Sequence, residues 1–336
     1  MKRAVSTLTL LLLAVPAILF AAPAGAATLR GVGTRVVTLL QSEQATDFRQ
    51  ATGNRVTYAI TGPDIALSDV ALGLADFAAV DAPLSPAQAT ACPACREIPR
   101  DVTAVGIGYH LPGIGNGLNL SGPVLAGIYL GQITNWSDPS IRRLNPHRRL
   151  PNLKITPLFS AGAADETYVL STYLSAISRR WRRQIGAGSQ VRFRAGTPEA
   201  GNAGIGGMVK RTAGAIGYMT TPYLFTQPQI SEARMQNAAG NFEYPSTASV
   251  FDAAKPVSRI PPRGASIVNP PKVRRQAYPI ATFTSSVVLA HPAHAWLLRR
   301  WLTFCITTAR YDAMGTGLSP LPPAPLRAAR AAIRSL

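Results

Sequence analysis

Residues 125–151 of this chain read LAGIYLGQITNWSDPSIRRLNPHRRLP, and residues 76–85, upstream of them, read DFAAVDAPLS. The apolar start of the longer stretch predicts a helix over Pro123–Leu130. In the shorter stretch, Asp81-Ala82-Pro83 follows the apolar run Phe77–Val80. A short apolar run that ends at turn-forming residues is typical of a buried strand. A short strand and a short helix, each followed by a turn, indicate a chain that alternates the two kinds of element.

The same alternation continues outward on both sides. Further strands are predicted at Val56–Ile60, Val105–Tyr109, Ile155–Phe159, Ala215–Met219 and Ala281–Leu289, and further helices at Val36–Gln50, Thr167–Arg180, Ala203–Arg211, Ala293–Thr308 and Leu326–Leu336. Strands that alternate with amphipathic helices are typical of an α/β protein, here with mixed sheets flanked by helices. The length, about 310 residues without the first 26, suits two lobes or domains.

The amino terminus has the three parts of a secretory signal peptide. Met1-Lys2-Arg3 is basic, Leu8–Ala22 is apolar, and Ala24-Gly25-Ala26 provides small residues for cleavage. We expect residues 1–26 to be removed after Ala26, and no cysteine stands there to carry a lipid. The apolar run is too short for a transmembrane anchor, and no later run spans a bilayer. The expected mature chain is exported to the periplasm, with secretion beyond it left open.

The charge of the chain is strongly unbalanced, because 34 Lys and Arg stand against 16 Asp and Glu, for a formal net charge of +18. This excess favours anionic ligands, anionic envelope surfaces or acidic partners, and export argues against nucleic acid. No Gly-x-Ser-x-Gly elbow, His–Glu metal motif or P-loop occurs. Asp165 and Glu166 are adjacent, so on a helix they point in different directions and cannot face each other as acid and base. We therefore expect neither an enzyme nor a cofactor.

The chain has three cysteines, Cys92, Cys95 and Cys305. Cys92 and Cys95 could close a small disulfide loop in an oxidising compartment. A redox-active pair is the alternative, although no thioredoxin-like βαβ pattern surrounds them. The four histidines show no ligand spacing, so no metal site is expected. Cys305 lies in the apolar run WLTFCI and is expected to be a small buried hydrophobic residue.

Seven short motifs follow one another in a fixed order along the chain: Leu29–Gly33, Thr52–Tyr58, Asp76–Ser85, residues 125–151, Ser171–Leu174, Gly201–Ile205 and Gly214–Tyr218. Each alone is weak, but in this order they resemble the periplasmic phosphate-binding proteins of ABC uptake systems over nearly the whole mature chain. The resemblance implies a two-lobed periplasmic binding protein of type II with a hinge. One lobe would be residues 27–105 with 279–336, and the other residues 106–278. It also implies a monomer that delivers a small anion to an ABC permease.

The resemblance places nine positions in the ligand site between the lobes: Thr34, Arg35, Val36, Pro63, Asp81, Ser160, Ala164, Asp165 and Glu166. Asp81 stands where the family has the carboxylate that accepts the proton of hydrogen phosphate, a proton that sulfate lacks. Most other positions differ from the family. Arg35-Val36 replaces Thr-Phe, Pro63 replaces a Ser, Ser160 replaces the Arg, and Ala164-Asp165-Glu166 replaces the Ser-Gly-Thr that opens a helix.

The change at Asp165 has the largest predicted consequence. In the family, the N–H groups of that helix N-terminus point at the phosphate, whereas Asp165 at or near the N-cap would take these donors and bring a carboxylate close to the anion. Two unit charges about 5 Å apart repel by roughly 3 kcal/mol at an effective dielectric constant near 20, about a hundredfold in affinity. Arg35 could supply a replacement cation, or it could pair with Asp165, Glu166 or Asp81.

Each of these residues also has a purely structural interpretation. Asp165 could be an ordinary helix cap, Arg35 an exposed residue at a helix start, and Asp81 a turn residue. Three functions therefore remain open. The chain could be an exported solute-binding protein for an oxyanion, phosphate by resemblance. It could bind a zwitterion or amine, which suits the mixed charge of the site. It could also be a non-transporting envelope protein that uses its basic surface and has a degenerate pocket.

Overall fold

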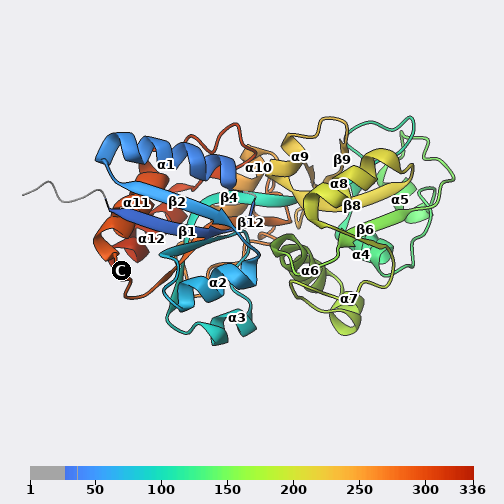
Figure 1. The fold of residues 1–336 in the computed structure, drawn as a ribbon. Helices are drawn as coiled ribbons and strands as arrows, with labels where there is room; N and C mark the ends of the chain where they lie inside the picture. The colour runs from blue at the N-terminus through green and yellow to red at the C-terminus, as the bar shows by residue number, and fades with distance from the viewer. Residues whose placement is uncertain (1–26, 36) are drawn as a thin grey trace, which may run out of the picture.

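The computed structural model describes residues 27–35 and 37–336. The predicted signal peptide, residues 1–26, and Val36 of the predicted site lie outside the described residues. Figure 1 shows two lobes side by side, with the carboxyl terminus in the lobe that contains β1 (Thr28–Gly33). Among the described residues, no helix is both long and apolar enough to cross a membrane.

Lobe 1, the lobe that contains β1, is built on a mixed sheet with the strand order β2-β1-β3-β12-β4. β2 (Arg55–Ile60), β1 and β3 (Phe77–Val80) are parallel to one another. β12 (Ala281–Leu289) runs antiparallel to both of its neighbours, β3 and β4 (Cys95–Tyr109). The short β13 (Ser319–Pro320) also pairs with β4.

Lobe 2 continues the strand order as β4-β8-β6-β7. β8 (Ala215–Thr220) is antiparallel to β4, whereas β6 (Thr156–Ser160) and β7 (Thr197–Glu199) follow it in parallel. β9 (Ser231–Glu232) also pairs with β4. A small separate sheet has the order β11-β10-β5 and consists of β11 (Phe242–Glu243), β10 (Arg234–Gln236) and β5 (Asn119–Leu120).

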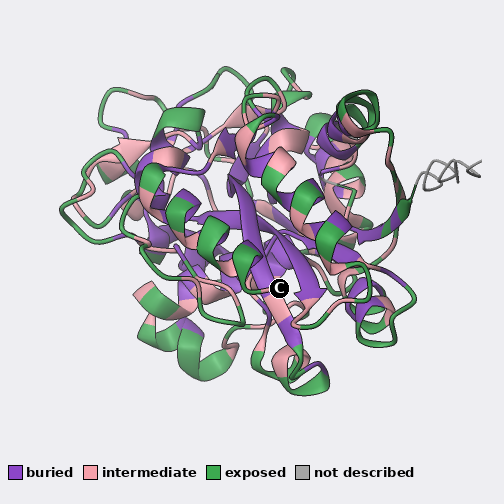
Figure 2. Cartoon of the chain, turned by 90° about the vertical axis from the view of Figure 1, so that its left-hand side faces the viewer, coloured by how far each residue is buried: buried purple, intermediate pink, exposed green. Residues whose placement is uncertain are grey.

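Helices cover the sheets and expose their outer faces, while the strands between them are mostly buried (Figure 2). Lobe 1 has α1 (Thr38–Thr52), α2 (Pro63–Ala71), α3 (Pro86–Ala91), α11 (Ala295–Thr307) and α12 (Pro323–Arg334). Lobe 2 has α4 (Gly122–Tyr129), α5 (Pro139–Leu144), α6 (Asp165–Ile177), α7 (Arg179–Gln184), α8 (Gly201–Arg211) and α9 (Thr221–Phe225). α10 (Thr247–Ala254) packs on β4, β12 and β13.

Strand β4 belongs to both lobes. Residues Cys95–Ala104 pair with β12, and Val105–Tyr109 pair with β8. The sequence predicted only the second part, because the first part, CREIPRDVTA, contains charged residues and a proline. Pro99 is tolerated in the strand since it lies at a bulge, where the register with β12 shifts. A single continuous strand therefore connects the two lobes.

The chain returns from lobe 2 to lobe 1 through residues 255–280. At the crossing, the Val105 N–H donates a hydrogen bond to the Ile280 carbonyl oxygen at 3.0 Å, so the outward and return connections are joined there. The bounds given above for the two lobes, 27–105 with 279–336 and 106–278, remain a prediction about which residues move together.

The predicted helix Thr167–Arg180 is wrong in its extent, because the structure has two helices, α6 and α7, separated by Ser178. Ser178 has extended backbone angles (φ −126°, ψ 110°), and its Oγ accepts a hydrogen bond from Trp181 N at 3.2 Å. It therefore caps α7 in the usual manner of a serine. Trp181 is fully buried, which fixes α7 against the lobe.

Each lobe has an aromatic centre. In lobe 1, the rings of Phe48 (α1) and Trp301 (α11) meet edge-on with centroids 5.3 Å apart, and Phe77 (β3) lies 6.2 Å from the same indole. In lobe 2, Phe193, which lies between α7 and β7, stacks on Phe159 (β6) at 4.5 Å and meets Trp181 of α7 edge-on with centroids 5.9 Å apart. These contacts hold the helices on the sheets, so the strand ends that carry the site residues have a rigid support.

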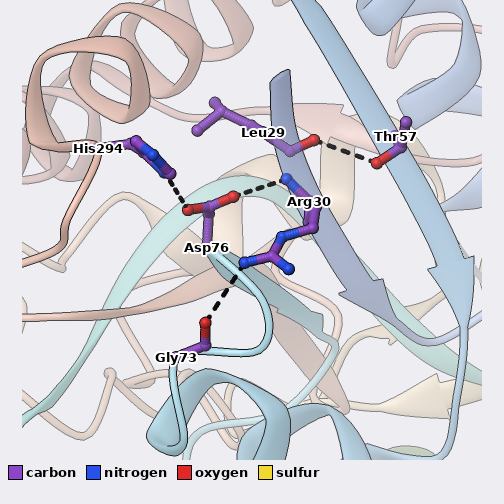
Figure 3. Close-up of polar contacts among 6 residues, drawn as sticks. All are labelled: Leu29, Arg30, Thr57, Gly73, Asp76 and His294. Atoms are coloured by element: carbon purple, nitrogen blue, oxygen red, sulfur yellow. Dashed lines mark hydrogen bonds and ion pairs between the residues drawn. The ribbon is translucent and has the colours of Figure 1, made fainter. Parts of the chain in front are cut away.

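Asp76, in the loop before β3, connects several parts of lobe 1 (Figure 3). Its Oδ2 accepts a hydrogen bond from Arg30 N in β1 at 2.7 Å, and its Oδ1 lies 2.8 Å from Nδ1 of His294, the N-cap residue of α11. The Arg30 guanidinium donates to the Gly73 carbonyl oxygen at 3.4 Å. This network aligns the starts of the parallel strands β1 and β3. The carboxyl ends of the two strands therefore lie side by side.

Cys92 and Cys95 form a disulfide between the end of α3 and the start of β4. A cross-link over so short a loop should contribute about 2 kcal/mol to the free energy of unfolding by the chain-entropy relation. We therefore expect the double variant Cys92→Ser, Cys95→Ser to lose that amount in urea denaturation. Reductant should destabilise the wild type by a similar amount and leave the variant unchanged, and an equal response of both proteins would contradict the prediction.

Candidate functional site

The structure distributes the predicted site residues over both lobes. Thr34 and Arg35 follow β1, Pro63 is the first residue of α2, and Asp81 directly follows β3. On lobe 2, Ser160 ends β6, Ala164 is the N-cap residue of α6, and Asp165 and Glu166 form its first turn. We call Thr34, Asp81, Ser160, Asp165 and Glu166 the interlobe site, because hydrogen bonds and charge interactions described below relate its two halves.

Asp81 is the central residue of the lobe 1 half. It is 3% exposed, its Oδ2 accepts a hydrogen bond from Thr34 Oγ1 at 2.5 Å, and its backbone carbonyl accepts one from Thr282 Oγ1 at 3.0 Å. Its Oδ1 is buried and has no hydrogen-bond partner. A buried acceptor without a partner is costly and therefore rare in proteins. Asp81 thus presents one free acceptor oxygen within a buried site.

Thr34 is held in place by its neighbours. Gly33 before it has φ +142°, and the Thr34 N–H donates to the Ala79 carbonyl oxygen of β3 at 3.2 Å. The Tyr58 hydroxyl of β2 donates to the Thr34 carbonyl oxygen at 2.8 Å. The turn after β1 is therefore fixed by both adjacent strands, with the Thr34 hydroxyl directed at Asp81.

Asp165 makes the direct contact between the two halves of the site. Its Oδ2 accepts a hydrogen bond from the Asp81 backbone N–H at 2.7 Å, and its side chain is buried. The interpretation of Asp165 as an ordinary helix cap is wrong, because Ala164 occupies the N-cap position and no side chain caps α6. The carboxylate instead contacts lobe 1, so α6 begins with two acidic residues and has no side-chain cap on its N-terminus.

Ser160 has a different environment from the one expected of a ligand donor. Its backbone N–H donates to the Tyr218 hydroxyl at 3.1 Å, and that hydroxyl lies 2.6 Å from Thr167 Oγ1 in α6. Tyr218 thus joins the end of β6 to the first turns of α6. Tyr218 and Thr167 were missed as site residues, although Gly214–Tyr218 was one of the motifs that carried the resemblance.

Arg35 is exposed, and in the described part of the chain no ion pair joins an Arg or Lys to Asp81, Asp165 or Glu166. The internal salt bridge between Arg35 and one of these acids, which the sequence left open, is therefore absent from the structure. Pro63 is half-buried at the start of α2 and supplies no donor. The site consequently consists of hydroxyl groups, backbone groups and carboxylates.

Burial changes the acidity of these carboxylates. Burial, and next the charge of Asp165, raise the pKa of Asp81 to about 8. Burial also raises the pKa of Asp165 to about 7, with Glu166 and Asp64 adding to the effect. The pKa of Glu166 is raised by burial as well. Near neutral pH the site therefore holds protons that exposed carboxylates would have lost.

Glu97 of β4 is a further buried carboxylate near the site that sequence reasoning missed. Its Oε2 accepts a hydrogen bond from the Leu84 N–H at 3.1 Å, and burial raises its pKa to about 8. The charge of Asp165 contributes to this rise. Glu97 lies in the part of β4 that was not predicted as a strand, so no sequence pattern placed it inside the protein.

A family model described as the PBP superfamily domain matches residues 20–308 of this chain. The phosphate-binding protein PstS of Xylella fastidiosa (strain Temecula1 / ATCC 700964) is 29% identical over 298 residues, which cover 87% of this chain and 81% of that protein. The phosphate-binding protein PstS of Pasteurella multocida (strain Pm70) is 32% identical over 245 residues, 73% of this chain and 71% of that protein.

Among solved structures, the phosphate binding protein from Stenotrophomonas maltophilia has a TM-score of 0.62 at 18% identity, and the match covers 90% of this chain and 93% of that one. At this identity the likeness shows a shared fold, that of a two-lobed periplasmic binding protein of type II. The family model and the relatives carry the assignment further. This chain belongs to the PBP superfamily and, within it, to the family of the PstS phosphate-binding proteins.

Proposed function

We propose that this protein is an exported solute-binding protein of ABC uptake that binds an oxyanion, phosphate by its family, between the two lobes. The observation that carries the proposal is the position of Asp81 and Thr34 at the ends of β3 and β1, opposite the first turn of α6. The hydrogen bond of 2.7 Å from Asp81 N to Asp165 Oδ2 joins these two parts of the site. Anion ligands commonly bind at a helix N-terminus, because its N–H groups are unpaired.

In this proposal each side of the site has a separate task. When Asp81 is ionised, its free Oδ1 accepts the proton of a protonated oxyanion, which a fully ionised oxyanion cannot provide. The first N–H groups of α6 donate to the anion, and Tyr218 positions them through Thr167. Closure of the lobes about β4 and residues 255–280 would bring the two sides together around the ligand.

The proposal includes the partners and the location of the protein. The protein would act in the periplasm after cleavage behind Ala26, would pass its ligand to an ABC permease, and would catalyse no reaction. The residue groups that close as units would be 27–105 with 279–336 and 106–278. Four exposed arginines of α7 favour an anionic envelope surface as an additional partner: Arg179, Arg180, Arg182 and Arg183.

Calorimetric titration of the ligand-stripped mature protein with inorganic phosphate tests this function. We expect one site with a dissociation constant in the micromolar range or below at about pH 5.5, where the buried carboxyl groups are protonated and do not repel the anion. At about pH 8.5, where Asp81 is largely ionised, Asp81→Asn should lower the preference for phosphate over sulfate by about tenfold or more, because the carboxylate accepts a proton that only phosphate provides, whereas an amide also offers a donor. Absence of heat and of thermal stabilisation with millimolar phosphate at every pH would remove phosphate as the ligand.

A second candidate is supported by the charge of the site. Asp81, Asp165, Glu166 and Glu97 are all buried, and the described residues give none of them a Lys or Arg ion-pair partner. A cationic group would compensate this charge better than an anion does. The same fold would then bind an amine or a zwitterion. Titration with amino compounds at about pH 9, above the pKa values of about 7 to 8 of Asp81, Asp165 and Glu97, distinguishes the two candidates, because these carboxylates are then ionised and phosphate binding should be weakest.

A further inference from the structure

The carboxylate of Asp165 contacts the interlobe site in the manner of a bound anion. It accepts the Asp81 backbone N–H at 2.7 Å, although it belongs to the other lobe, and both residues are buried. It also starts the helix whose N–H groups the proposed function assigns to the ligand. An external oxyanion that uses these same donors must either displace the Asp165 carboxylate or share the site with it.

The charged and titratable groups around Asp165 are almost all acidic. Glu166 lies beside it on α6, Asp81 follows β3, Asp64 belongs to α2, and Glu97 lies on β4. Three tyrosines also lie near these groups. The Tyr58 hydroxyl of β2 is committed to the Thr34 carbonyl, and the Tyr218 hydroxyl of β8 contacts Ser160 N and Thr167 Oγ1 near Glu166. Tyr168 of α6 lies near Glu97 and near Arg263, a cation of the segment that returns to lobe 1. Arg100, which faces Tyr58, contacts Gln44 and Trp301 instead of these carboxylates. An ionised site would therefore repel an oxyanion, by about a hundredfold in affinity for each carboxylate at close range.

We propose that Asp165 makes the site proton-coupled, so that a small oxyanion binds together with protons taken up by the site's own carboxyl groups. When Asp165 is ionised, it stays on the Asp81 N–H and acts as a tethered anion that competes with the ligand. When Asp165 is protonated, it becomes a neutral O–H donor for the oxyanion. The inference rests on the proposed function and adds its dependence on pH and its ligand class, small oxyanions such as inorganic phosphate.

The replacements in the site fit this chemistry. The family's Arg is replaced by Ser160, so a cationic donor is missing from that position. A protonated carboxyl group can supply a donor without adding a charge that must be compensated. The raised pKa values of Asp81, about 8, and Asp165, about 7, show that the protonated forms are accessible near neutral pH. The protons come from solvent and return to it when the ligand leaves.

The matched variant is Asp165→Asn, which keeps the size of the side chain and removes its charge. Calorimetry with inorganic phosphate at about pH 5.5, 6.5, 7.5 and 8.5, each in two buffers of different ionisation enthalpy, gives the affinity and the number of protons taken up. The wild type should lose about tenfold in affinity per pH unit for each proton coupled to binding. The variant should bind at least about tenfold more tightly than the wild type at about pH 8.5 and take up about one proton fewer.

Phosphate also changes its own protonation over this pH range. Its contribution to affinity and proton uptake is the same for variant and wild type, so it cancels when the two proteins are compared. Glu43→Gln, an equal charge change on the exposed face of α1, should leave affinity and proton uptake unchanged. Should Asp165→Asn fold poorly by circular dichroism, Asp165→Gly, which restores the residue type of the family, replaces it. Equal affinity and equal proton uptake in wild type and variant would overturn the inference and leave the proposed function standing. Absence of phosphate binding in both at every pH would instead overturn the proposed function.

Discussion

Lowering the pH from about 8 to about 5 should stabilise this protein against unfolding by at least about 3 kcal/mol. The cause is the group of buried carboxyl groups whose pKa values are raised in the folded state, Asp81 and Glu97 to about 8, Asp165 to about 7 and Asp101 to about 6. In the unfolded chain such groups have pKa values near 4. The folded state therefore binds more protons than the unfolded state between about pH 4 and pH 8.

The sign of the effect follows from this difference. The stabilising contribution is present in full below the unfolded pKa near 4 and is lost as the pH rises through the folded pKa values of about 6 to 8. Between its unfolded and folded pKa values, each group adds about 1.4 kcal/mol to the free energy of unfolding per pH unit of acidification. Asp81 or Glu97 alone, each with a folded pKa of about 8, therefore suffices for the stated amount. Below about pH 4 the gain should level off, and repulsion among the excess cations should then oppose it.

Urea denaturation over this pH range measures the effect. Glu97→Gln and Asp165→Asn should each flatten the dependence on pH, because each removes one titrating carboxyl group. Glu43→Gln, on the exposed surface, should not change it. A free energy of unfolding that stays constant or falls on acidification to about pH 5 would show that these carboxylates are ionised in the folded protein.

Replacing Gly33 with alanine should destabilise the protein by about 3 kcal/mol or more, because two separate costs coincide. Gly33 has φ +142°, a backbone conformation that L side chains rarely adopt. An added Cβ would also collide with the Ala79 carbonyl oxygen and would lie 2.9 Å from the Tyr58 hydroxyl. The backbone of β3 cannot move aside without losing its pairing with β1, so the strain has no simple release.

The same substitution should weaken ligand binding, since Gly33 precedes Thr34 and the Tyr58 hydroxyl positions the Thr34 carbonyl. Gly115→Ala is the matched control. Gly115 lies in an exposed loop, is not among the glycines with positive φ, and a Cβ added there would meet no atom within 4 Å, so this variant should stay within about 0.5 kcal/mol of the wild type. Urea denaturation of both variants tests the loss of stability, and phosphate titration tests the loss of affinity. Equal stability of the two variants would contradict the structural role given to Gly33.

The sequence predicted the elements that have a clear apolar pattern. Phe77–Val80 and Ala281–Leu289 have the predicted bounds as β3 and β12. The first half of β4 was missed, because burial of Glu97, Arg100 and Asp101 in the sheet contradicts every local preference for exposure. The helix break at Ser178 was missed as well, since a serine that caps the next helix looks like any polar residue inside a long one.

The sequence predicted which residues belong to the site but not the contacts between them. The resemblance selected Asp81 and Asp165 from positions 84 residues apart, and the structure joins them. The contact itself depends on how the two lobes meet, which no local pattern encodes. Tyr58 and Tyr218 were missed for a related reason, because each acts through a hydroxyl that holds another residue in place.

The position of β12 has a consequence for the order in which the chain folds. β12 lies between β3 and β4 in the sheet of lobe 1, yet all of lobe 2 separates it from them in the sequence. The strands of lobe 2 that extend the large sheet are complete once residue 232 has emerged, whereas β3 and the first half of β4 keep open edges until residue 289 follows. Open edges pair readily with other chains. A late segment of the chain therefore closes the first lobe to begin folding, and the interval between the two is when a newly made chain is most exposed to aggregation.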